Sequence, residues 1–229
     1  LAVNAYLKGV LAAARPDDGW LSEETADTDV RLGKRRTWVV DPIDGTRDFL
    51  RGRTGWAVSV ALVEDGLVTV GVLAAPAQER LYAASAGRGA TLNGTRLAVS
   101  GLATLDGVRL PIDAANMAAS FWPSPWPGTA TPKPNSLALR MAMLAANEAD
   151  AWLEGRSIAE WDVAAASLIL TEAGGVLTDR HGAALAFNRP SPIIQGIAAA
   201  TPALHCEVLH RLDHALKAFA ARREQRGAA

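Results

Sequence analysis

The residues whose types and spacing could do chemistry are densest in the run Asp41-Pro42-Ile43-Asp44-Gly45-Thr46. Proline restricts the backbone between the two aspartates, so both carboxylates and the Ile43 carbonyl can face one point. Such oxygen ligands suit Mg²⁺, which proteins hold with one or two carboxylates together with phosphate oxygens. The N–H groups of Gly45 and Thr46, at the start of a short helix, would then meet a phosphate group. The same residue types are typical of an ordinary turn, and that alternative stays open for this run alone.

Two further acidic sites lie far from this run in the chain. Glu23 and Glu24 come before the strand that leads to Asp41, although adjacent glutamates are most often a solvated surface. Asp162 opens the apolar helical run Val163–Leu170, where it is most simply an N-cap. A helix this apolar points its end into the fold, and a carboxylate buried there needs a partner. A metal ion would be such a partner.

Taken together and in this order, these segments resemble the inositol monophosphatase superfamily. The residues that carry the resemblance are Glu23-Glu24, Asp41 to Thr46, Trp161-Asp162-Val163-Ala164-Ala165-Ala166 and Glu172-Ala173-Gly174-Gly175. That superfamily consists of Mg²⁺-dependent, lithium-sensitive phosphomonoesterases. The resemblance implies an α/β fold layered αβαβα, of the inositol monophosphatase and fructose-1,6-bisphosphatase type. It implies one domain over residues 1–229, with an N-terminal α+β half (1–110) that carries the metal motif and a C-terminal α/β half (111–229).

The resemblance also implies roles for individual residues. It implies that the metal ions are held by Glu23, Asp41, Ile43, Asp44 and Asp162. Glu23 and Asp44 then also serve catalysis, with the Thr46 hydroxyl orienting the attacking water. Two Mg²⁺ ions are expected, one lowering the pKa of bound water and the other stabilising the leaving group.

One departure from the family pattern lies at the start of the chain. In the family, a Thr-x-x-Asp segment comes just before the helix that matches Leu1–Ala14, and its aspartate helps to bind a third metal ion. That segment and the family's first helix are missing from the sequence given. The resemblance therefore predicts weak or no catalysis for this fragment and an active full gene product.

The substrate is predicted from a second set of residues. Those expected to contact it are Asp44, Gly45, Thr46, Ser136, Glu154, Arg156 and Asp162. Glu154 is the candidate for sugar hydroxyls, and Arg156, expected in the same loop, could clamp a second phosphate. The run Asn135-Ser136-Leu137 is similar to that of bisphosphate nucleotidases.

Lys133 and the loop tryptophans would also suit a nucleotide. Trp122 or Trp126 could stack on adenine, although such residues more often pack in a core. The sequence thus favours a 3′(2′),5′-bisphosphate nucleotidase that converts adenosine 3′,5′-bisphosphate to AMP and phosphate. The alternatives are an inositol-1-monophosphatase and a non-catalytic relative that binds metal or phosphate.

Several elements must position these side chains. A buried strand at Thr37–Val40 ends at Asp41, and Glu64-Asp65-Gly66 predicts a tight hairpin. The strands expected beside that turn are Trp56–Val63 and Leu67–Leu73. Later elements are a helix at Ser136–Asn147 capped by Ser136, a strand at Ala149–Glu154, a helix at Asp162–Ala173, and a helix at Pro202–Arg223 with proline in its first turn.

Composition restricts the class of protein. The chain has 229 residues, 49% of them hydrophobic and 21% charged, with a formal net charge of −1, which excludes disorder. No apolar run approaches the roughly 18 residues of a membrane span, and no basic excess indicates a nucleic-acid polymer as partner. The lone Cys206 fits a reducing cytoplasm. The expected partner is a small phosphorylated substrate, and family members are often homodimers.

Overall fold

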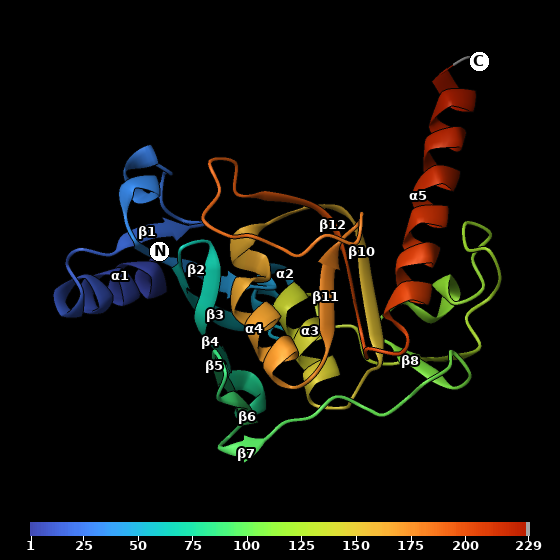
Figure 1. The fold of residues 1–229 in the computed structure, drawn as a ribbon, viewed down its shortest axis with the longest axis horizontal. Coiled ribbons are helices and arrows are strands. Elements are labelled where there is room, and N and C mark those ends of the chain that lie inside the picture. Colours follow the sequence, from blue (N-terminus) through green and yellow to red (C-terminus); the bar gives the residue numbers. More distant parts are fainter. Residues whose placement is uncertain (228–229) are drawn as a thin grey trace.

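The chain folds into alternating layers of helices and sheets (Figure 1). They are seen in a computed structural model that describes residues 1–227. Helix α1 (Ala2–Ala14) contacts the first sheet through β2, and the pair α3 (Leu137–Ala145) and α4 (Ala164–Glu172) lies between that sheet and a smaller one. Helix α5 (His205–Gly227) covers the smaller sheet by packing on β10 and β12. The predicted αβαβα order is confirmed.

The large sheet has seven strands in sequence order, each hydrogen-bonded to the next. They are β1 (Gly19–Ser22), β2 (Arg36–Asp44), β3 (Ala57–Glu64), β4 (Leu67–Ala75), β5 (Arg80–Ser85), β6 (Gly89–Leu92) and β7 (Thr95–Arg96). Strands β1 and β2 are parallel, and all later neighbours are antiparallel. The predicted hairpin between β3 and β4 is confirmed, with Asp65 and Gly66 at φ +51° and +82°.

The strand predicted at Thr37–Val40 is too short. Strand β2 continues through Asp44, and its register against β3 shifts between Asp41 and Asp44. A bulge of this kind tolerates Pro42, which has no N–H to donate to the ladder. The bulge is therefore what lets two aspartates three positions apart leave one strand within the same short segment.

The small sheet consists of β10 (Ala151–Ala159), β12 (Ile193–Ala200) and β11 (Val176–Asp179), in that spatial order and antiparallel. A separate parallel pair joins β8 (Val108–Leu110) to β9 (Gly128–Ala130). The prediction that β10 ends at Glu154 is wrong, because the strand resumes after a register shift between Glu154 and Ser157. Arg156, expected in a loop, therefore lies within a strand.

The helices differ from prediction mainly at their beginnings. Ser136 is the N-cap of α3, as predicted, with its Oγ accepting a hydrogen bond from the Leu139 N–H at 2.9 Å. The short helix α2 (Thr46–Leu50) follows the metal motif. Helix α5 begins at His205, so Pro202 lies outside it rather than in its first turn.

The core is built around α4, whose residues from Ala164 to Leu170 are all buried. A second apolar cluster joins α5 to the irregular segment before β9, and it contains Trp122 and Trp126, which are only 9% and 4% exposed. The Trp122 indole donates to the Asn116 carbonyl at 2.7 Å. The interpretation of these tryptophans as core residues is therefore confirmed, and the alternative that they stack on adenine is not. Across residues 1–227, no helix is long and apolar enough to cross a bilayer.

Candidate metal centre

The bulge at the end of β2 is held by hydrogen bonds within the motif itself. Asp41 Oδ1 accepts from the Ile43 N–H at 2.9 Å, and the Thr46 hydroxyl donates to the Ile43 carbonyl at 3.0 Å. Gly45 makes the turn at φ +90°, in the left-handed region. These contacts place Asp41, the Ile43 carbonyl and Thr46 in one tight loop. Their roles as metal ligands and water-orienting hydroxyl stay predictions.

Asp44 is tied to the beginning of α3. Its Oδ2 accepts from Ser136 Oγ at 2.5 Å and from the Ala138 N–H at 2.8 Å, and its Oδ1 accepts from the Leu137 N–H at 3.2 Å. A carboxylate at a helix N-terminus is stabilised by the unpaired N–H groups of the first turn. Ser136 is fully buried, so its position favours holding Asp44 over touching a substrate.

Asp162 reaches the same space from the opposite side. It ends a 3₁₀ turn, Glu160–Asp162, and its Oδ2 accepts from the Ala159 N–H at 2.9 Å. The predicted role as N-cap of α4 is wrong, because α4 begins only after Val163. Asp162 instead closes the turn before the helix, and that turn packs against β2.

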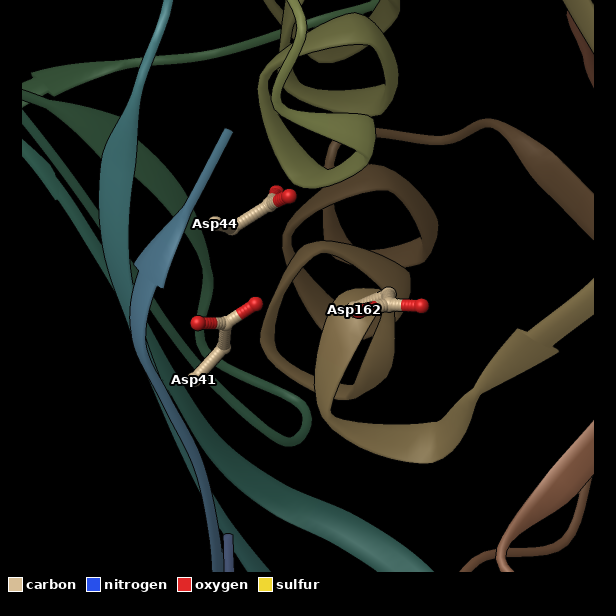
Figure 2. Close-up of side chains that lie close together, drawn as sticks. All are labelled: Asp41, Asp44 and Asp162. Atoms are coloured by element: carbon tan, nitrogen blue, oxygen red, sulfur yellow. The ribbon is translucent and has the colours of Figure 1, made fainter. Parts of the chain in front are cut away.

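The structure brings these three aspartates together (Figure 2). One carboxylate oxygen from each of Asp41, Asp44 and Asp162 lies within 4.8 Å of the others. Glu23 follows β1 and is exposed, outside this triad, but its charge acts on both Asp41 and Asp162. A set of hard carboxylate oxygens from separate elements fits a divalent cation such as Mg²⁺.

The pKa values of the three aspartates are raised because their carboxylates are buried close together. Burial raises the pKa of Asp41 well above its usual range, and the charges of Asp44, Glu23 and Asp162 raise it further. Burial, with the charges of Asp44 and Glu23, raises the pKa of Asp162 to about 7. Burial also raises the pKa of Asp44, although the bonds from α3 oppose that rise. A bound cation would relieve this repulsion, which supports the fit of the site to a metal.

Beside the triad lies a polar basin of about 520 Å³. Its walls carry five basic and two acidic side chains together with Asn135: Arg47, Arg53, Lys133, Arg140, Arg156, Asp113 and Glu154. Both acids are paired, Glu154 with Arg156 at 2.8 Å and Asp113 with Lys133 at 2.5 Å. The basin is therefore positive, and its charges reach the triad, since Arg156 lowers the pKa of Asp162 and Arg140 that of Asp44.

Sequence reasoning missed Arg140, together with Arg47, Arg53 and Asp113 of this basin. The Arg140 side chain is 7% exposed, and its Nε donates to the Pro134 carbonyl at 2.8 Å. Its Nη1 makes no hydrogen bond within the described chain. The signal was a single charge inside the otherwise apolar helix Leu137–Ala145, which indicates a buried cation with a specific partner.

The layered fold with a buried acidic triad beside a positive basin defines a metal-dependent phosphatase. The sequence profile of the inositol monophosphatase family matches residues 1–216, and the chain belongs to that family. It is 35% identical to a histidinol-phosphatase of Mycobacterium tuberculosis, over 93% of this chain and 82% of that one. It is 34% identical to an inositol-1-monophosphatase of Mesorhizobium japonicum, over 75% and 67%. Among solved structures, an inositol monophosphatase of Thermotoga maritima superposes with TM-score 0.78 at 27% identity, over 93% and 81%.

Proposed function

We propose that this phosphatase is a Mg²⁺-dependent 3′(2′),5′-bisphosphate nucleotidase, which hydrolyses adenosine 3′,5′-bisphosphate to AMP and phosphate. The observation that carries the proposal is the uncompensated positive charge of the basin beside the aspartate triad. Glu154 and Asp113 are both paired to cations, and Arg53 lies 3.8 Å from the Asp48 carboxylate, so Arg47 and Arg140 remain to receive an anion. A substrate with a second phosphate supplies one.

The buried guanidinium of Arg140 suits that second phosphate best. Burial lowers the pKa of Arg140, and the charges of Glu154 and Asp44 oppose that shift, so an anion bound in the basin would add to their effect. Arg140 Nη1, which makes no hydrogen bond within the described chain, can donate to a phosphate oxygen. Binding such an anion would satisfy both the charge and the donors.

Different residues of the chain would then bind the cations, orient the attacking water and bind the phosphate. Asp41, Asp44, Asp162 and Glu23 would hold the cations, of which we propose two. Bound Mg²⁺ lowers the pKa of water and neutralises charge on the phosphoryl oxygens. The hydroxyl of Thr46 would orient the attacking water, and the N–H groups of Gly45 and Thr46 would bind the scissile phosphate. Glu154 would keep Arg156 in place at the basin wall.

The charge of the basin separates this substrate from two others. Inositol 1-phosphate presents neutral hydroxyls to the basin, and histidinol phosphate presents an ammonium group, which positive walls repel. Turnover of the three esters on one full-length preparation tests the proposal. We expect the highest kcat/KM for adenosine 3′,5′-bisphosphate. A preference for either monophosphate would overturn the nucleotide assignment while leaving the family membership intact.

The substitution D41N tests the metal centre itself. It removes one ligand charge without changing side-chain volume, so the fold should persist. We expect kcat/KM to fall by more than about a hundredfold, the upper range for residues that merely support metal ligands. With a chelator present, the unfolding temperature should not fall, because the variant removes a buried, repelled carboxylate. Mg²⁺-dependent turnover that survives in D41N would contradict the assignment of Asp41.

A further inference from the structure

A second hollow of about 900 Å³ lies against the basin. Arg53, Lys133 and Asn135 line both, so the segment Pro132 to Asn135 forms a common wall. The position of this wall sets how much room the basin gives a substrate. A residue that fastens the wall can therefore influence specificity without touching the substrate.

Asp48 is the residue that holds this wall in place. It lies on α2, two residues after Thr46, and is 5% exposed. Its Oδ1 accepts from Asn135 Nδ2 at 2.9 Å, and its Oδ2 accepts from the Asn135 N–H at 3.1 Å. One carboxylate thus holds both the side chain and the backbone of Asn135.

The close approach depends on a glycine. A Cβ atom on Gly55 would lie 2.1 Å from Asp48 Oδ2 and 3.1 Å from Pro134 Cα. Gly55 also uses its carbonyl to accept from the Ser136 N–H at 3.0 Å. The metal motif, the Gly55 segment and the wall are therefore joined at one point.

Arg140 is hydrogen-bonded to the same wall. Its guanidinium donates to the Pro134 carbonyl at 2.8 Å and to the Asn135 carbonyl at 3.5 Å. Both carbonyls belong to the wall that Asp48 holds. Asp44, in contrast, has its own three bonds from Ser136, Leu137 and Ala138, so loss of Asp48 leaves the hold on the metal motif in place.

We propose that Asp48 and Asn135 form a specificity-determining pair that positions the basin wall and Arg140 for a second anionic group of the substrate. This rests on the proposed bisphosphate substrate. Asp48 is a positioning residue, since it acts through Asn135 and, at 3.8 Å, through Arg53 on the basin wall. Its loss weakens recognition of the distal phosphate and leaves the chemical step at the metal centre unchanged.

Three variants test the pair. In D48N the new amide presents donors to the donors of Asn135, so one bond is lost. In N135D two carboxylates face each other. The double variant D48N/N135D restores both bonds, because the amide at position 48 can donate to the carboxylate at 135 and accept from its backbone N–H. The milder N135A removes only the side-chain bond, should a charged variant fold poorly.

Each variant is assayed with adenosine 3′,5′-bisphosphate and with p-nitrophenyl phosphate, which has no second anion. We expect D48N and N135D to lower kcat/KM for the bisphosphate by about tenfold to a hundredfold, the range of a lost charged hydrogen bond, mainly through KM. Turnover of p-nitrophenyl phosphate should stay close to that of the wild type. N135A should show a smaller loss of the same kind, and the double variant should recover most of the wild-type KM.

The matched control is D150N. Asp150 is also a buried aspartate with several bonds, from Ser100 and Arg109, and it lines neither hollow. D150N should leave the ratio of the two substrates unchanged. Equal losses on both substrates, no recovery in a folded double variant, or the same shift in D150N would overturn the proposed pair. A wild type without preference for the bisphosphate would overturn the proposed function as well.

Discussion

At the residue scale, the metal centre is a set of carboxylates that repel one another in the absence of a cation. Asp41 and Asp44 are 2% and 5% exposed, and Asp162 faces them from another element. The raised pKa values of all three follow from burial first and from mutual repulsion second in Asp41 and Asp162. The site therefore favours either protons or a divalent cation, and the two compete.

This competition predicts how stability depends on pH. Unfolded aspartates titrate near pH 4, while the folded pKa of Asp162 is about 7 and that of Asp41 is raised further. The folded state thus holds more protons than the unfolded state, so the free energy of unfolding of metal-free protein falls as pH rises from about 4 through these values. Mg²⁺ binds the deprotonated acids, so the rise in unfolding temperature that it produces should grow with pH.

Thermal unfolding with a chelator or with Mg²⁺, at about pH 6 and about pH 8, measures this dependence. Sodium chloride at matched ionic strength is the control for screening. The D41N variant should show a weaker pH dependence without metal, because the most strongly shifted group is gone. A Mg²⁺ effect of equal size at both pH values would show that the triad is not the site of the competition.

At the element scale, the motif works because the end of β2 and the beginning of α3 approach closely. Gly45 permits this approach, since a Cβ there would lie 2.7 Å from the Gly55 carbonyl oxygen and 2.8 Å from the Ser136 nitrogen. Its φ of +90° is also unfavourable for any side chain. The contact that holds Asp44 to α3 is therefore directly dependent on one glycine.

The variant G45A should lose both stability and activity. Backbone strain alone costs about 1–3 kcal/mol, and the steric clash adds to it. We therefore expect the free energy of unfolding to fall by more than the strain accounts for. Gly52, at φ +63° with open space around its Cβ position, is the matched control. G52A should show only the strain and should keep its turnover. Chemical denaturation and kcat/KM of both variants would decide, and equal losses would contradict the role of the close approach.

Local signals explain which elements could be predicted from the sequence. Three predicted features depend only on neighbours in the chain, and the structure confirms them. They are the hairpin at Asp65-Gly66, the cap at Ser136 and the paired aspartates of β2. The bulges in β2 and β10 could not be predicted, because a register shift is set by the partner strand.

Site residues brought in by tertiary contact were missed for a related reason. Arg140 belongs to the basin only because α3 turns one face toward it, and the pair of Asp48 with Asn135 joins residues far apart in sequence. Trp122 and Trp126 left two interpretations open, because an aromatic residue in a loop looks the same whether it packs inside, as these do, or faces a ligand. Composition alone cannot separate these cases.

At the scale of the whole molecule, one core joins the two halves of the chain. It runs from Leu21 on β1 to Ala199 on β12, and α4 contributes to it between both sheets. Helix α4 contacts β3, β4, β5 and β6 on one side and β11 on the other. Because neither sheet can keep its buried face without α4, we propose that residues 1–229 fold as one domain.

One domain predicts one cooperative unfolding transition, with tryptophan fluorescence and far-ultraviolet circular dichroism following the same curve. The variant I169A tests the coupling, since Ile169 is fully buried in α4 within the shared core. Removing its side chain should lower the free energy of unfolding by about 2–5 kcal/mol and move both curves together, because the lost packing belongs to both halves at once. Two separate transitions, of which I169A moves only one, would mean that the sheets unfold independently and that α4 belongs to one of them.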